Sequence, residues 1–123
     1  MKYFSTNHQA PDATLREAVV RGLAPDRGLY MPKQINVMPR EFFEHMTFRE
    51  MSFEVAKAFF GDDVDEPSLK QIVDDTLAFE TPVVNVEQNI YTLELFHGPT
   101  LAFKDVGARF MARLLQYFIK KEG

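Results

Sequence analysis

Apolar residues recur at helical spacing through the first eighty positions of the chain. Thr14 and Thr47 are each followed three residues later by a glutamate, which predicts a capping box at the start of a helix. We expect the first helix to end near Gly22 and the second near Gly61. The apolar positions on the two helices are Leu15, Ala18 and Val19 on the first, and Phe48, Met51, Val55, Ala58 and Phe59 on the second.

Four further elements are predicted in the same region. Pro67 suits the first turn of a helix that runs to about Phe79, and a shorter helix is expected over residues 39–45. A strand is predicted at residues 2–5, and a turn at residues 24–32 leads into a brief extended piece. The inward face of the Pro67 helix consists of Leu69, Ile72, Val73 and Leu77.

The pattern changes after residue 80. Residues 83–86 and 90–96 read as two strands joined by a hairpin loop, and a long helix is predicted from about Leu101 to Lys121. The fold class is therefore α/β, with a mainly helical region at residues 1–80 and the start of an α/β domain at residues 81–123, in the order β-β-loop-α. Two strands do not form a stable sheet alone, so we expect the start of a larger protein.

Composition narrows the function classes. The 123 residues carry 14 Lys and Arg against 18 Asp and Glu, a net charge of −4 without a basic cluster, which disfavours nucleic-acid binding. No apolar run is long enough for a membrane span, and the N-terminus lacks a signal peptide, so the cytoplasm is the expected compartment. Because the chain has no cysteine and only three scattered histidines, no metal site is expected.

The candidate chemistry lies in the segment LFHGPTLAFKD, residues 95–105. With about 100° per residue, the last helix has a narrow polar stripe of Arg109, Arg113, Gln116 and Lys120. Lys104 instead falls between Met111 and Leu115, in the middle of an apolar arc that we expect to be buried. If Thr100 is the N-cap, both burial and the positive end of the helix dipole disfavour the charged ammonium. A neutral lysine is a nucleophile that forms Schiff bases with aldehydes, and the helix N-terminus favours a nearby anion, a combination that describes pyridoxal phosphate.

Simpler interpretations of the same residues remain open. A lysine near a helix start can turn its long stem out to water. Gly98 and Pro99 are typical of a turn, and His97 is typical of a structural hydrogen-bonding residue. The two arginines, Arg109 and Arg113, are typical of a solvated face or a partner surface.

The run ELFHGPTLAFKDVGARFM, residues 94–111, resembles the lysine segment of threonine synthases, which share the fold of the tryptophan synthase β chain. The resemblance extends upstream through Pro82 and residues 28–30 to Tyr3, and so covers essentially the whole chain. One departure is Arg27, where many members of that family have glycine.

The resemblance implies that Lys104 is the catalytic residue and forms the Schiff base with pyridoxal 5'-phosphate. Phe103 and Asp105 flank it and are candidate cofactor-binding residues. The family converts O-phospho-L-homoserine and water to L-threonine and phosphate. Its residues that hold the cofactor phosphate lie beyond Gly123, so we expect this chain alone to be an inactive N-terminal portion. The rival hypotheses are a dehydratase-like enzyme of the same fold group and a non-catalytic helical interaction module.

Overall fold

The computed structural model describes residues 1–122 and contains four α-helices, five strands and one short 3₁₀ helix within that range. In chain order the elements are β1 (Lys2–Ser5), β2 (Ala13–Thr14), α1 (Leu15–Arg21), β3 (Tyr30–Pro32), η1 (Arg40–Phe43), α2 (Phe48–Phe60), α3 (Glu66–Thr76), β4 (Val83–Glu87), β5 (Ile90–Leu93) and α4 (Lys104–Glu122).

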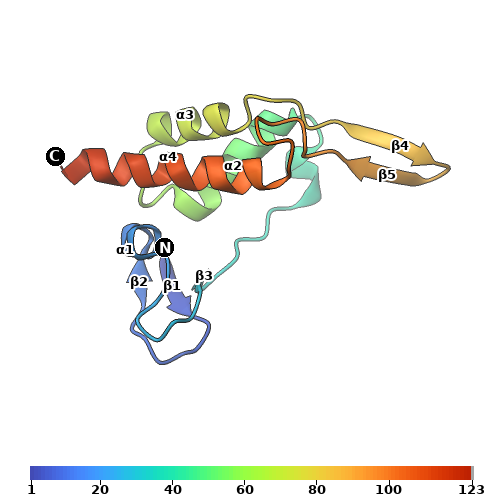
Figure 1. Cartoon of the computed structure of the whole chain (residues 1–123). Helices are drawn as coiled ribbons and strands as arrows, with labels where there is room; N and C mark the ends of the chain where they lie inside the picture. Colours follow the sequence, from blue (N-terminus) through green and yellow to red (C-terminus); the bar gives the residue numbers. More distant parts are fainter. Residues whose placement is uncertain (123) are drawn as a thin grey trace.

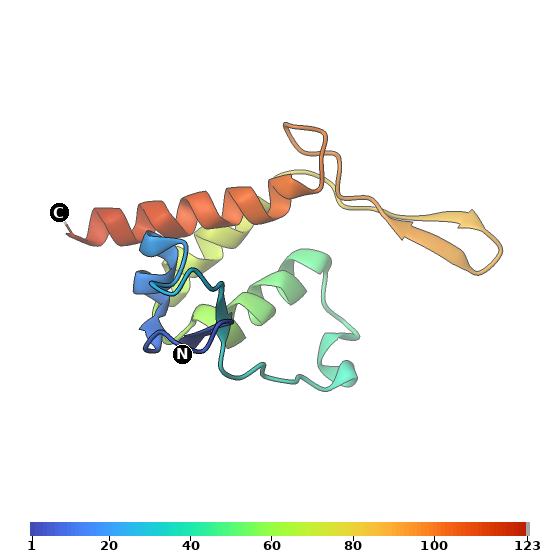
Figure 2. The same cartoon turned by 60° about the horizontal axis from the view of Figure 1, so that its bottom comes forward.

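The helices form a packed group with the two sheets on different sides of it. Helix α3 packs against both α2 and α4, and α1 packs against α4 (Figure 1). The antiparallel sheet, in the order β2-β1-β3, lies beside α1. The hairpin β4-β5 extends away from the helices in both views (Figure 2). None of the helices described combines the length and the apolar composition that a membrane crossing requires.

One hydrophobic core joins the two ends of the described chain. Leu69 and Val64 are fully buried at its centre, and Tyr3 from β1 and Phe118 from α4 belong to the same cluster. Residues from both predicted regions therefore contribute to this core. The division at residues 80 and 81 remains a prediction.

The helix starts follow the predicted capping chemistry. In α1 and α2, the threonine hydroxyl accepts a hydrogen bond from the glutamate N–H, and the glutamate carboxylate accepts one from the threonine N–H. Helix α3 begins instead at Asp65, whose carboxylate accepts from Ser68 N–H. The buried faces predicted for α1 and α3 are confirmed.

The apolar positions at helical spacing in α2 do not form its buried face. Phe48 and Val55 are exposed, whereas Ala56 is buried and Phe53 and Phe60 pack against the core. The apolar residues of α2 surround much of its circumference, so their spacing alone does not decide which of them meets α3.

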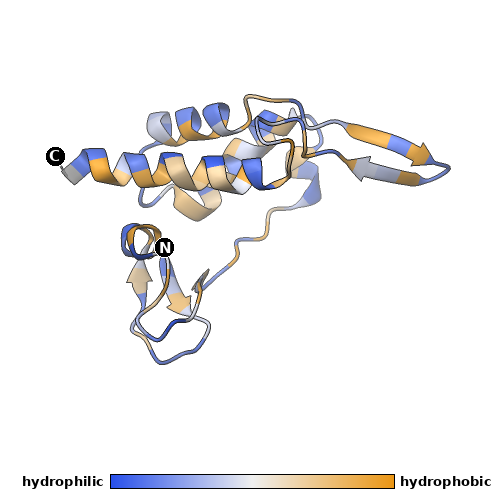
Figure 3. Ribbon diagram, in the orientation of Figure 1, coloured by the Kyte–Doolittle hydropathy of each residue, from blue (hydrophilic) through white to orange (hydrophobic). Residues whose placement is uncertain are grey.

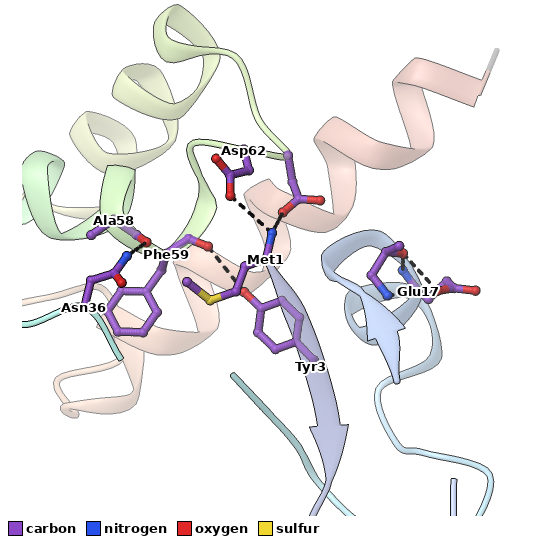
Figure 4. A network of polar contacts seen from close by, with 9 residues as sticks. Met1, Tyr3, Glu17, Asn36, Ala58, Phe59 and Asp62 are labelled. Atoms are coloured by element: carbon purple, nitrogen blue, oxygen red, sulfur yellow. Dashed lines mark hydrogen bonds and ion pairs between the residues drawn. The ribbon is translucent and has the colours of Figure 1, made fainter. Parts of the chain in front are cut away.

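A network of polar contacts ties β1 to the C-terminal end of α2 (Figure 4). The Met1 ammonium lies 3.2 Å from a carboxylate oxygen of Asp63 and 3.4 Å from one of Asp62. The Tyr3 hydroxyl donates to the Phe59 carbonyl oxygen at 3.5 Å. Burial of its ring, followed by the nearby Asp63 carboxylate, raises the pKa of Tyr3 to about 12.

The hairpin β4-β5 is exposed on both faces. Val83 pairs with Leu93 in antiparallel register, a bulge follows Asn85, and Asn89 in the turn has φ of 63°. Strand β5 ends three residues before the predicted Phe96, because the last bond of the ladder runs from Glu94 N–H to the Pro82 carbonyl. Strand β4 is mostly apolar with one polar interruption, and β5 is mostly of intermediate hydropathy (Figure 3).

Candidate lysine site

The segment between β5 and α4 forms a compact loop that ends at Lys104. The Leu101 N–H donates to the Gly98 carbonyl at 3.0 Å and closes a tight turn. Leu101 has φ of 54°, a left-handed conformation that is uncommon for a residue with a branched side chain. The loop therefore keeps a conformation that the chain alone does not favour, and contacts elsewhere must hold it.

Asp105 provides those contacts from the first turn of α4. Its carboxylate accepts hydrogen bonds from the Thr100 N–H at 2.8 Å and the Thr100 hydroxyl at 2.9 Å. The side chain is buried, with 4% of its surface exposed. It also lies against Gly98, where an added Cβ would come within 2.5 Å of a carboxylate oxygen, so only glycine fits there without a shift.

The predicted helix start at Leu101, with Thr100 as N-cap, is wrong. Helix α4 begins at Lys104, after bonds from Asp105 N–H to the Ala102 carbonyl and from Val106 N–H to the Phe103 carbonyl. The Thr100 hydroxyl bonds to the Asp105 side chain rather than capping the backbone. Lys104 still lies at the first residue of the helix, where free backbone N–H groups gather.

The predicted burial of Lys104 is also wrong for the described chain. Lys104 is exposed, and of its two neighbours on the wheel Met111 is 48% exposed, whereas Leu115 is partly buried against the core. Helix α4 instead buries the flank next to this arc, through Leu114 and Phe118, against α1 and α3. Within the described residues, no hydrogen bond or ion pair engages the Lys104 amine.

Arg109 does not belong to a solvated stripe. Its guanidinium donates to the Asp75 carbonyl at 2.7 Å and to the Thr76 carbonyl at 3.2 Å, at the C-terminus of α3. Arg113 follows one turn later, with its guanidinium 3.6 Å from the Asp75 carboxylate. These contacts fix the helix that carries Lys104 to α3, a role that the helical wheel could not reveal.

His97 is paired within the same loop. Its Nε2 lies 2.7 Å from a Glu94 carboxylate oxygen, and its ring lies against that of Phe96. Phe103, the neighbour of Lys104, is 74% exposed. The loop therefore presents an unpaired amine beside an exposed aromatic ring.

A separate apolar groove of about 380 Å³ runs between α1 and α4. Its walls include Val19, Tyr30, Phe110 and Met111. Lys104 does not line it, so the groove and the lysine loop are different features of the surface.

A sequence model of the family described as "Threonine synthase N terminus" matches residues 2–77. The chain belongs to the threonine synthase family. The curated threonine synthase of Escherichia coli (strain K12) is 37% identical over 120 residues, and that of Haemophilus influenzae is 38% identical over 117 residues. The alignments cover 95% and 94% of this chain but only 28% and 27% of those relatives.

Solved threonine synthase structures match the fold closely. The PLP-bound enzyme of Brucella melitensis aligns with a TM-score of 0.93 and 34% identity, over 100% of this chain and 28% of its own. The Escherichia coli enzyme aligns with a TM-score of 0.89 and 35% identity, over 97% of this chain and 28% of its own. These matches confirm the α/β fold class and the resemblance drawn from the lysine segment.

The sequence did not predict two contacts of the site, namely the bond between Asp105 and Thr100 and the contact of Arg109 with α3. The first had one usable signal, since an acidic residue in the first turn of a helix is favourably placed for N–H groups before it. The second had none, because it depends on how two helices pack.

Proposed function

We propose that this chain supplies the lysine segment of an enzyme that converts O-phospho-L-homoserine and water to L-threonine and phosphate in the cytoplasm. Lys104 is the proposed residue that holds pyridoxal 5'-phosphate, through its amine. The observation that carries the proposal is an exposed, unpaired amine at the first residue of α4, at the end of a fixed loop, in a chain of this family.

The surroundings of Lys104 are suited to the attachment of this cofactor to a lysine. The Lys104 amine is accessible to an aldehyde, and no carboxylate among the described residues is paired with it. When bound, the cofactor supplies an electron sink for the substrate's α and β carbons. Phe103 is proposed to shape the pocket beside the lysine, as its exposed ring allows.

The chain's own residues perform two tasks in this proposal. The Lys104 amine, once free of the cofactor, takes up and returns protons at the substrate's α and β carbons. The loop before it holds the lysine backbone in place while the side chain moves. Because the chain spans about 28% of its curated relatives, we propose that it is inactive without a partner segment equivalent to the remainder.

A chimera tests the proposal. Residues 1–122 of this chain replace the matching part of the Escherichia coli threonine synthase, and the purified protein is titrated with pyridoxal phosphate. We expect a saturable absorption band at about 410–420 nm and release of phosphate from O-phospho-L-homoserine. Lys104→Ala removes both, and the matched variant Lys120→Ala, at an exposed lysine on the same helix, removes neither.

Retention of the band and of phosphate release in the Lys104→Ala chimera refutes the role of Lys104. The isolated 123-residue chain provides the second test. A band that saturates at micromolar cofactor with this chain alone, and that is lost in Lys104→Ala, contradicts the proposed need for a partner segment.

A further inference from the structure

We propose that Asp105 is a positioning residue, which fixes the backbone of Lys104 by bonding the loop before it to the first turn of α4. This inference rests on the proposed function of Lys104 and deepens it. It differs from a direct contact between Asp105 and the cofactor, because the Asp105 carboxylate is buried and turned towards Thr100.

The hydrogen-bonded pair of Thr100 and Asp105, which encloses Lys104 along the chain, is called the bracket below. Thr100 lies four residues before Lys104 and Asp105 lies one residue after it, and two hydrogen bonds join them across this span. The bond from the Leu101 N–H to the Gly98 carbonyl closes a turn that overlaps the start of this span. The backbone at Lys104 is therefore held from both sides while its side chain stays free.

The contact is suited to a carboxylate. Both oxygens are used, one by an N–H group and the other by a hydroxyl, and hydrogen bonds to a charged acceptor are stronger than neutral ones. The negative charge lies in the first turn of a helix, where the dipole favours it. The two bonds oppose the tendency of Leu101 to leave its left-handed conformation.

Asparagine is the informative replacement at this position. Its amide oxygen still accepts from the Thr100 N–H, and its amide nitrogen can donate to the Thr100 hydroxyl oxygen, so the shape and both bonds are kept. Alanine keeps neither and leaves the Thr100 N–H without its acceptor. A positioning role therefore predicts a large effect for Asp105→Ala and a small one for Asp105→Asn.

The first experiment measures amide hydrogen exchange in the full 123-residue chain. Asp105→Ala is expected to speed exchange of the Thr100 N–H by about tenfold or more, whereas Asp105→Asn changes it by less than about threefold. The reference amide is that of Ile72 in α3, which is expected to keep its rate. Unchanged exchange at Thr100, or equal acceleration at Thr100 and Ile72, overturns the proposed local bracket.

The second experiment uses the chimera titrated with pyridoxal phosphate. Asp105→Ala is expected to raise the apparent Kd for the cofactor by about tenfold, and Asp105→Asn is expected to restore most of the affinity. Gln116→Ala, at an exposed position of the same helix, is the control that keeps the parent affinity. Equal affinity in Asp105→Ala and the parent overturns the positioning role.

The two experiments separate this inference from the proposed function. If Lys104→Ala keeps the absorption band, the proposed function fails, although the exchange rate at Thr100 can still show the bracket. If Lys104→Ala loses the band while Asp105→Ala keeps it, the lysine role stands and the positioning role is rejected.

Discussion

Arg109 is expected to make the most important polar contact between α4 and α3. Helix α3 ends without glycine at its cap and without a basic residue in its last turn. Donors from neighbouring helices satisfy its carbonyls instead: Arg109 reaches those of Asp75 and Thr76, and Arg49 reaches that of Leu77 at 3.0 Å. Removing Arg109 therefore exposes a helix end that has no local substitute.

The magnitude follows from the number and type of these contacts. A hydrogen bond from a charged donor contributes about 1.5–3 kcal/mol, and the favourable charge at a helix C-terminus adds about 0.3–1 kcal/mol. The guanidinium also lies 5.8 Å from the centroid of the Phe79 ring. Because the site is only half-buried and one bond is long at 3.2 Å, we expect Arg109→Ala to lower the free energy of unfolding by about 2–4 kcal/mol.

Urea unfolding of the chain followed by circular dichroism measures this change. Arg109→Lys keeps the charge but not the fork of donors, and we expect it to recover less than half of the loss, about 1 kcal/mol. Arg113→Ala is the matched control on the same helix, with an expected loss of less than about 1 kcal/mol because its contact is a longer, partly exposed ion pair. A loss below about 0.5 kcal/mol in Arg109→Ala refutes the reasoning.

Three further predictions concern the N-terminal sheet and its surroundings. Arg27 is exposed with φ of 68°, so Arg27→Gly should raise the free energy of unfolding by roughly 0.5–1 kcal/mol, measured in urea, and an unchanged or lower value contradicts backbone strain there. Burial lowers the pKa of the Met1 amine, but its bonds to Asp63 and Asp62 outweigh this and raise the pKa above 8.0. The contribution of these bonds to the free energy of unfolding is therefore complete below about pH 8 and is lost as the pH rises through the folded pKa. Bonds from the Thr14 N–H and hydroxyl lower the pKa of Glu17 below 4.5, so the capping contribution is present above about pH 4.5 and is lost as the pH falls through the folded pKa. Thermal unfolding measured as a function of pH checks the direction of both effects. Acetylation of Met1 should reduce the loss of stability at alkaline pH, and Glu17→Gln should reduce the loss at acid pH.

The elements that the sequence predicted well are those decided by neighbours along the chain. The capping boxes at Thr14 and Thr47 depend on residues three positions apart, and both form as expected. The buried face of α3 follows from a clear separation of apolar and polar positions. The lysine segment was recognised because its motif is long and distinctive, and the relatives aligned over nearly the whole chain support that recognition.

The errors fall where distant residues decide the outcome. Helix α4 is apolar around most of its circumference, and its packing against α1 and α3 selects the Leu114 flank, which leaves Lys104 exposed. The helix begins at Lys104 and not at Leu101, because the Thr100 hydroxyl bonds to the Asp105 side chain instead of capping the backbone. The polar stripe that includes Arg109 predicted a face in contact with solvent. A helical wheel does not show that the C-terminal carbonyls of another helix need hydrogen-bond donors.

The sharing of one core by Tyr3 and Phe118 sets the order in which the chain can fold. Bringing these residues together closes a loop of more than one hundred residues, an entropy loss that local helix contacts do not incur. The helical hairpin of α2 and α3 can pack early, and β1 can pair with β2 and β3, but the shared core is complete only when α4 has docked on α1 and α3. During synthesis on the ribosome, this core therefore stays open until the last helix has been made, and Lys104 takes its final position in the same late step.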